Sequence, residues 1–138
     1  MAENAAPTGA VEPKDVVEVS LPAASAYLSV LRTATAGLAA RLDFTLDEIE
    51  DLRIAVDEAC AMLLPSAIPG TSLTCTFELQ GDALRIAVSV PTSDGLEPSR
   101  TTFAWTVLTA LAGEVDSRTS GDGTVTIELI KRRGSGQA

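Results

Sequence analysis

The sequence predicts an α+β fold, a two-layer sandwich in which helices cover one face of a mostly antiparallel mixed sheet. Three observations lead to this prediction. The segments follow the order strand, helix, helix, strand, strand, helix, strand, strand, which suits one sheet with its helices on one side. Two pairs of strand-like segments are joined by short turns that contain glycine. In the remaining segments apolar residues recur at helical spacing, so each helix has one face to bury.

The first third of the chain predicts a strand followed by a helix. Residues 16–21 alternate well enough between apolar and polar side chains to form a strand, and Pro22 ends it. The alanine-rich residues 23–41 then predict a helix. Its expected apolar side consists of Tyr27, Leu28, Leu31, Leu38 and Leu42.

The best-defined helix is predicted at residues 45–64. Thr45 and Glu48 have the spacing of a capping box, in which each side chain satisfies a free backbone N–H of the first turn. Pro65 ends the helix because proline cannot continue its hydrogen bonds. Glu58 lies at the border of the apolar face, where an acid is either a solvated rim residue or part of a site. That apolar face consists of Ile49, Leu52, Val56, Ala59, Cys60 and Leu63.

The second half predicts two hairpins around a third helix. Residues 73–79 and 83–90 alternate on either side of Gly81-Asp82, and residues 114–118 and 124–131 form the second pair. A polar loop leads into a helix at residues 102–112, which Gly113 ends. We expect Trp105 to be buried in the core rather than to contact a partner. The apolar stripe of this helix consists of Phe103, Val107, Leu108 and Leu111.

Length and composition restrict the possible functions. The 138 residues suit one domain, expected at 15–131, between flexible tails at 1–14 and 132–138. A net charge of −9 argues against binding nucleic acid through phosphates, and it suits either a basic partner or simple solubility. The absence of histidine excludes Ser-His-Asp and Cys-His catalysis.

The chain shows no targeting signal. It contains neither a membrane-length apolar run nor a secretory signal pattern, so we expect a cytoplasmic protein with no membrane contact. Cys60 and Cys75 lie in apolar patterns and are expected to be reduced and buried. They could form a redox switch only if their Cα atoms lay within about 7 Å.

Two separate segments resemble a known family. Residues 42–48 read Leu-Asp-Phe-Thr-Leu-Asp-Glu and lead to Ile-Ala-Val-Asp-Glu-Ala at 54–59, and residues 103–112 read Phe-Ala-Trp-Thr-Val-Leu-Thr-Ala-Leu-Ala. With the element order over 15–131, they resemble the Bergerat (GHKL, HATPase-type) ATP-binding superfamily. The closer resemblance is to actinobacterial anti-sigma factors that are similar to the anti-sigma-factor serine kinases.

The resemblance implies an ATP site of which only part is retained. Glu58 matches the catalytic glutamate, the base that activates the attacking hydroxyl. Met62 stands where the family has the asparagine that ligates Mg²⁺, and a thioether is a poor ligand for that hard cation. Asp94 and Gly95 match the adenine-binding motif only with a gap, and Thr126 matches a last-strand threonine.

A further glycine motif of the ATP site is missing from the sequence. Residues 101–105, Thr-Thr-Phe-Ala-Trp, replace the glycines that let backbone N–H groups approach phosphates. Binding of ATP or ADP with Mg²⁺ is therefore expected to be weak or lost, and with it kinase activity.

The resemblance also implies a function and its partners. Members of the family sequester a stress-response or sporulation sigma factor and release it when an anti-anti-sigma factor competes. Arg32 matches an arginine that contacts the sigma factor, although its other interpretation is a solvated surface arginine. A homodimer is implied as well. Two alternatives stay open: an active serine kinase that phosphorylates the anti-anti-sigma factor, and a dimerisation or scaffold domain that has lost both roles.

Overall fold

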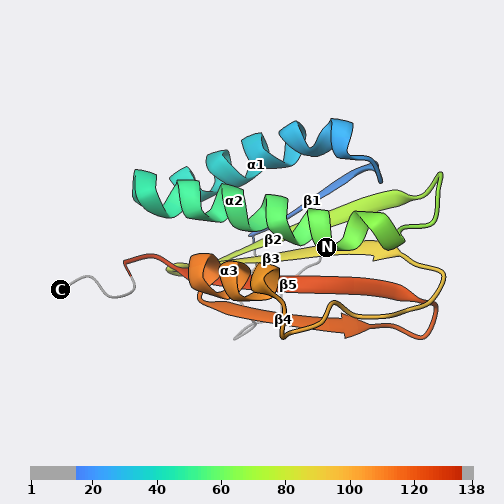
Figure 1. Cartoon of the computed structure of the whole chain (residues 1–138). Helices are drawn as coiled ribbons and strands as arrows, with labels where there is room; N and C mark the ends of the chain where they lie inside the picture. Colours follow the sequence, from blue (N-terminus) through green and yellow to red (C-terminus); the bar gives the residue numbers. More distant parts are fainter. Residues whose placement is uncertain (1–14, 135–138) are drawn as a thin grey trace, which may run out of the picture.

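The computed structural model describes residues 15–134 and contains one five-stranded sheet with three helices on one face (Figure 1). The predicted α+β two-layer sandwich is confirmed. Short 3-10 turns precede the first helix at Ser25–Tyr27 and follow the second at Leu64–Ser66. The regular elements, in chain order, are β1 Asp15–Pro22, α1 Leu28–Arg41, α2 Leu46–Leu63, β2 Ser72–Gln80, β3 Ala83–Pro91, α3 Phe103–Ala112, β4 Glu114–Thr119 and β5 Thr124–Arg132.

The sheet has the order β1-β2-β3-β5-β4, and all four pairings are antiparallel. The sequence analysis expects a mostly antiparallel mixed sheet, and the difference arises at the crossover through α3. The strands β3 and β4 point the same way, since both run antiparallel to β5. However, β5 folds back into the position between them, so these two strands do not pair.

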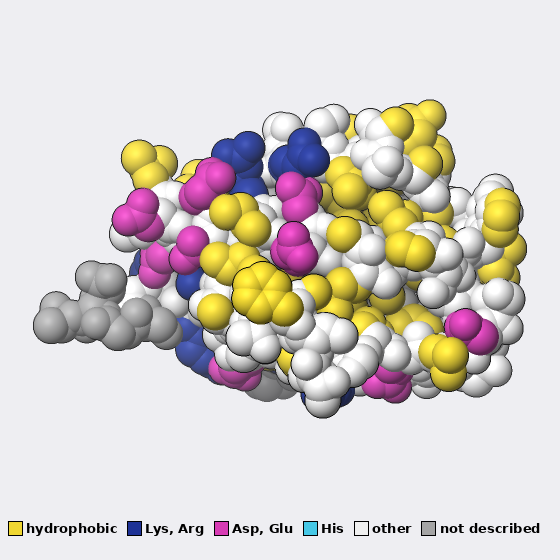
Figure 2. Space-filling view, in the orientation of Figure 1, with side chains coloured by type: hydrophobic (Ala, Val, Ile, Leu, Met, Phe, Trp, Pro, Cys, Tyr) yellow, Lys and Arg dark blue, Asp and Glu magenta, His cyan; other side chains and the backbone are white. Residues whose placement is uncertain are grey.

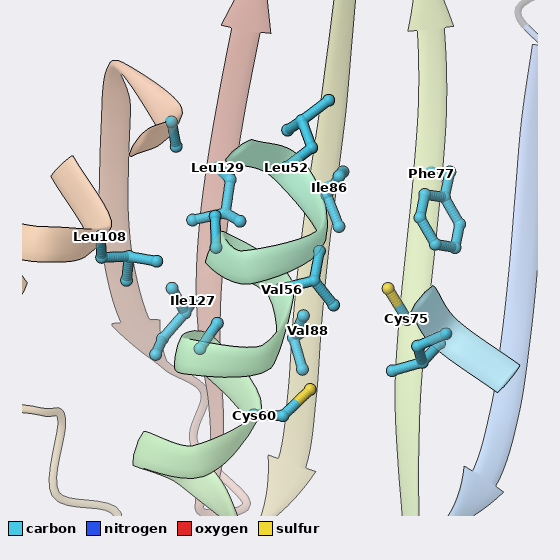
Figure 3. Close-up of a cluster of buried hydrophobic side chains, with 14 of the residues drawn as sticks. Leu52, Val56, Cys60, Cys75, Phe77, Ile86, Val88, Leu108, Ile127 and Leu129 are labelled. Carbon is cyan, nitrogen blue, oxygen red and sulfur yellow. The ribbon is translucent and has the colours of Figure 1, made fainter. Parts of the chain in front are cut away.

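Helix α2 lies over the centre of the sheet and supplies the middle of the core (Figure 3). Leu52, Val56 and Cys60 of α2 are fully buried, and they face β3 and β5. On those strands the buried residues alternate with partly exposed ones, as expected for a sheet with one covered face. Burying one such aliphatic side chain stabilises the fold by roughly 1.5–3 kcal/mol. The strand residues in this cluster include Cys75, Phe77, Ile86, Val88, Ile127 and Leu129.

The predicted capping box is present at the start of α2. The Thr45 N–H donates to Oε1 of Glu48 over 2.8 Å, and the Glu48 N–H donates to Oγ1 of Thr45 over 3.1 Å. The second Glu48 oxygen accepts the N–H of Gly134 over 2.9 Å. Arg133 also donates to the carbonyl oxygen of Leu42 over 3.2 Å. The C-terminal tail expected from residue 132 thus begins with residues bonded to the domain, while 1–14 and 135–138 lie outside the described residues.

Two aromatic residues that the sequence analysis places in the core are exposed instead. Tyr27 is 45% exposed because α1 begins one residue later, after the 3-10 turn, so Tyr27 is not in register with the buried face. Phe103 is 82% exposed, whereas Trp105 is 8% exposed, which confirms the expected burial of Trp105. Residues two apart on a helix point in nearly opposite directions, so Phe103 and Trp105 cannot share the core face.

The two cysteines are free and buried, as expected. Burial, with a smaller contribution from the Asp57 carboxylate, raises the pKa of Cys60 to about 12. Burial also raises the pKa of Cys75. Both groups are therefore protonated thiols at neutral pH and pack as small apolar side chains.

Glu48 is expected to make the stability of the fold pH-dependent. Burial opposes its ionisation, but the N–H groups of Thr45 and Gly134 outweigh burial and lower the pKa of Glu48 below its ordinary value of 4.5. A lowered pKa means that the stabilisation is present above the ordinary pKa and is lost as pH falls through the folded pKa. When the pH is lowered from about 6 to about 3, the free energy of unfolding should therefore fall by about 1 kcal/mol less in Glu48→Gln than in wild type. Urea unfolding across this range measures the difference.

The matched control for this prediction is Glu50→Gln, which removes an acid paired only with Arg53 on the exposed face of α2. Its pH dependence should follow that of wild type. Parallel curves for Glu48→Gln and wild type would show that Glu48 does not carry the acid sensitivity.

Candidate functional site

Two consecutive acids of α2, Asp57 and Glu58, lie on opposite flanks of its buried face. Asp57 faces α1, where the Nε–H of Arg32 donates to both of its carboxylate oxygens over 3.0 and 2.8 Å. Glu58 lies on the other flank with Asp51 and Met62, which are seven residues before it and four after it. This second flank faces α3 and β5, as the separation of 3.8 Å between Asp51 and Lys131 indicates.

The flank with Glu58 offers one free carboxylate but no oxygen ligand at the position one turn later. Glu58 is half-buried, and within residues 15–134 its side chain has no hydrogen bond or ion pair. Met62, one turn later, is also half-buried and packs against the core cluster. Its thioether cannot replace the hard oxygen donor that Mg²⁺ requires. Over the described range, no group of three or more acidic or cysteine side chains is arranged to hold a metal ion.

Asp94 and Gly95 fold the loop that follows β3. The Asp94 carboxylate accepts the N–H of Leu96 over 3.1 Å, which closes a local turn. The Gly95 N–H donates to Oγ1 of Thr92 over 2.8 Å, and the same hydroxyl donates to the carbonyl oxygen of Gly123 over 2.7 Å. Gly95 has a φ of +65°, a conformation that favours glycine. Both residues therefore have a structural role in this loop.

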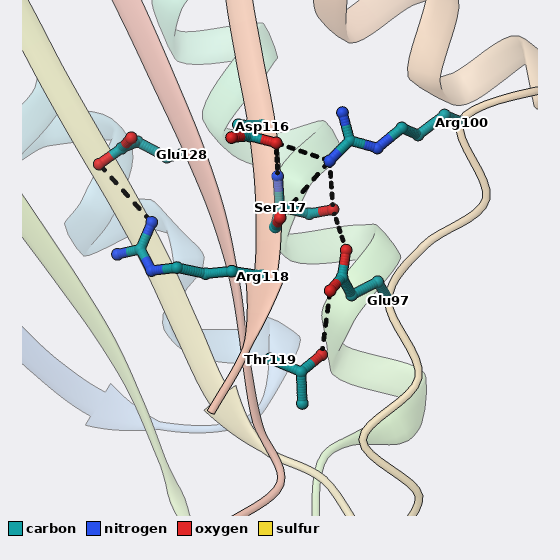
Figure 4. Close-up of polar contacts among 7 residues, drawn as sticks. All are labelled: Glu97, Arg100, Asp116, Ser117, Arg118, Thr119 and Glu128. Carbon is teal, nitrogen blue, oxygen red and sulfur yellow. Dashed lines mark hydrogen bonds and ion pairs between the residues drawn. The ribbon is translucent and has the colours of Figure 1, made fainter. Parts of the chain in front are cut away.

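Residues 94–102, which we name the β4 strap, run along β4 and bond to it (Figure 4). Arg100 donates through Nη2 to Oδ1 of Asp116 over 2.6 Å and to Oγ of Ser117 over 3.2 Å. Ser117 in turn donates to Glu97 over 2.7 Å, and Thr119 donates to the same carboxylate over 3.4 Å. The hydrogen bond from Arg100, together with the Ser117 N–H, lowers the pKa of Asp116 below its ordinary value. Among the described contacts, every side-chain bond from the β4 strap to another element goes to β4 or α3.

The start of α3 is closed by its own side chains. Oγ1 of Thr102 accepts the N–H of Trp105 over 3.2 Å and so occupies a donor of the first turn. The Arg100 guanidinium lies over the Trp105 ring, 4.9 Å from its centroid, which adds a cation–π contact. One of the N–H donors at this helix end is therefore used within the protein.

Thr126 lies on the face of the sheet that carries no helix. Its neighbours Val125 and Ile127 point into the core, so the alternation of the strand turns Thr126 to the opposite side. There its hydroxyl is 2.7 Å from that of Ser89 on β3. The structure therefore does not bring Thr126 together with Glu58, which belongs to the helix layer.

These residues do not fit the Mg·ATP site that the resemblance implies. The metal position holds a thioether, the loop motif is used for its own turn, the first turn of α3 is capped, and the last-strand threonine faces away. Glu58 alone keeps the expected residue type and a free side chain. We therefore assign no catalytic step to this site.

Comparison with known proteins identifies the family. No protein-family model matches the chain. The anti-sigma-F factor RsbW of Mycobacterium tuberculosis is 34% identical over 120 residues, which are 85% of this chain and 70% of that protein. The chain belongs to the RsbW family. The resemblance to anti-sigma factors and their kinase relatives is thus confirmed.

Another relative matches a shorter part of the chain, and a solved structure matches its fold. The serine-protein kinase RsbW of Halalkalibacterium halodurans is 36% identical over 80 residues, 57% of this chain and 49% of that kinase. A crystal structure of the RsbU and RsbW domains of a Mycobacterium tuberculosis protein matches with a TM-score of 0.68 at 18% identity. That match covers 88% of this chain and 33% of the other, and it supports the fold alone. No helix in the described part of the chain has the length and apolar character needed to cross a membrane.

Sequence reasoning missed several residues that organise this region. The position of Asp57 in the sequence could have indicated its contact with Arg32. Both residues lie at similar distances from the short link between two consecutive helices, and in an antiparallel helix pair such residues lie opposite each other. The β4 strap carries no such signal, because Arg100 and Asp116 are ordinary surface residue types in the sequence.

Arg100→Ala is expected to loosen the β4 strap without unfolding the domain. The substitution removes the bonds to Asp116 and Ser117 and the contact with Trp105, so the free energy of unfolding should fall by about 1 kcal/mol. Amide hydrogen exchange in the strap should accelerate, while exchange in the buried α2 stays slow. Arg41→Ala, which removes a long exposed pair with Asp15, is the control. Unchanged exchange in the strap would contradict the prediction.

Proposed function

We propose that this protein is an anti-sigma factor that sequesters a stress-response sigma factor and is released by anti-anti-sigma factors. One observation carries the proposal: the chain is 34% identical to an anti-sigma-F factor over most of both proteins. Sequestration needs a stable binding surface and no chemistry, so it does not depend on the ATP-site residues that are missing here.

The exposed face of α1 supports this proposal. Arg32 and Arg41 are the only charged residues of this helix, in a protein in which 21% of residues are charged. Val30 is 46% exposed and borders a shallow depression of about 430 Å³, which Ser29, Thr33 and Ala34 also line. A protein partner can cover such a surface without stripping water from many charges. Arg32 lies at the edge of this face, and we propose that it contacts the sigma factor.

The charge of the protein suits a basic partner. The net charge is −9, and acidic side chains gather over α2 on the helix-covered face (Figure 2). Sigma factors bind DNA, which makes a basic surface on them reasonable. Complementary charge would raise the association rate and the selectivity of the complex. We propose further that the protein acts as a homodimer in the cytoplasm and binds no nucleic acid directly.

The second candidate function is a serine kinase that phosphorylates the anti-anti-sigma factor. Two observations favour it: a relative is a serine-protein kinase, and Glu58 keeps the residue type and a free carboxylate. The poor fit to Mg·ATP makes it the weaker proposal, and loss of both roles would leave only a scaffold domain.

Arg32→Glu is expected to weaken sigma-factor binding at least about tenfold, since it reverses the charge at the proposed contact. Sigma-F-type factors from the same genome serve as ligands in gel filtration, calorimetry and in vitro transcription. Wild type should form a stable complex and inhibit transcription that depends on that sigma factor. Arg118→Glu makes the same charge change on the sheet face that carries no helix, away from α1, and should bind nearly as wild type does. Absence of binding and inhibition by wild type would overturn the proposed function.

Calorimetry with Mg·ATP is expected to show no saturable binding up to about millimolar nucleotide, since the metal and phosphate positions lack suitable groups. Met62→Asn alone should not restore phosphotransfer to an anti-anti-sigma factor, because the glycines remain absent. Saturable binding by wild type, or strong activity in the single variant, would favour the kinase function.

A further inference from the structure

We infer that Asp57 is a positioning residue, which fixes the Arg32 guanidinium so that its outer edge meets an acidic side chain of the sigma factor. This inference rests on the proposed function. Both Asp57 oxygens accept from Nε of Arg32, over 3.0 and 2.8 Å. The pair joins α1 to α2, and Figure 2 shows basic and acidic side chains meeting along the boundary between these helices.

The geometry leaves the useful part of the arginine free. A guanidinium has five N–H groups, and Asp57 engages only the one on Nε. Within the described residues, the Nη groups of Arg32 have no hydrogen-bond acceptor. The Arg32 side chain is 41% exposed, so the Nη edge can reach solvent or a partner. That edge presents two parallel donors, the arrangement that binds a carboxylate in a bidentate way.

The pair is better suited to preparing a contact than to stabilising the fold. Asp57 is 34% exposed and Arg32 is 41% exposed, and ion pairs with that much solvent contribute little to stability. The two helices already pack together through buried apolar residues, among them Leu31 of α1 and Leu52 of α2. A free arginine would lose much rotamer entropy on binding, and a side chain already held by Asp57 loses less.

The chemistry of the surroundings selects the partner group. Arg32 is the single cation in the first 13 residues of α1, beside an α2 surface rich in carboxylates. A basic partner that approaches this acidic region would have to present one acid at the position of Arg32. Such a match in the pattern of charges gives specificity that overall charge attraction cannot give.

A double-mutant cycle with the sigma-F-type factors tests the inference. Asp57→Asn should weaken binding about tenfold, equivalent to about 1.4 kcal/mol, because Arg32 is no longer held. In the Arg32→Ala background, the same substitution should have no further effect. Asp57→Glu, which keeps the carboxylate, should recover part of the affinity. The control is Glu50→Gln, which removes one negative charge from α2 at the pair with Arg53 and should leave affinity nearly unchanged.

The outcomes separate this inference from the proposed function. Full affinity of Asp57→Asn, or an equal loss in the Arg32→Ala background, would overturn the positioning role while sigma-factor binding stands. Equal effects of Asp57→Asn and Glu50→Gln would assign the loss to net charge and also overturn it. If wild type binds none of the sigma factors, the proposed function fails and this inference with it. Slow solvent exchange of the Arg32 Nε–H, measured by NMR in the free protein and lost in Asp57→Asn, would support the pairing itself.

Discussion

The burial of one face of α2 against the centre of the sheet is the constraint on which the rest of the structure depends. Leu52 and Val56 lie over β3 and β5 and are fully buried. Because this face is fixed, the flanking residues of α2 are fixed as well, with Asp57 towards α1 and Glu58 towards α3. A residue's position around this one helix thus decides whether it lies beside α1 or beside α3.

The β4 strap shows how a loop can serve the fold instead of a ligand. A strand at the edge of a sheet offers free backbone groups to other chains, and proteins often cover such edges. Here Arg100 and Glu97 bind side chains of β4 and hold the loop along it. At the end of the strap, the Thr102 hydroxyl also takes one N–H donor of the first turn of α3.

The fold of this protein therefore does not depend on the residues that would bind a nucleotide. The fold matches that of a solved chain with RsbU and RsbW domains, although the positions that the resemblance implies for phosphate and metal carry other residue types. The binding surface proposed on α1 does not depend on those positions, because it needs shape, few charges and one well-placed arginine. Packing of α1 on α2 provides the shape, and the carboxylate of Asp57 holds the arginine.

The sequence by itself determined the element types, the capped start of α2 and the family. These features depend on neighbours in the chain: alternation in strands, helical periodicity, and the Thr45–Glu48 spacing. It also placed Glu58 and Met62 on one flank, because helical geometry relates residues four apart. The sequence analysis wrongly placed Tyr27 and Phe103 in the core because both lie at helix starts. There a shift of one residue in the helix boundary turns a side chain from the core to solvent.

Only the tertiary structure decided which distant groups meet. The insertion of β5 between β3 and β4 made the sheet wholly antiparallel, and the packing of Val125 and Ile127 into the core turned Thr126 to the face away from the helices. The pairing of Arg32 with Asp57 joins residues on two helices, and no local pattern specifies which flank each helix presents to the other. Contacts of this kind follow from how whole elements pack, so their partners appear only once the layers are assembled.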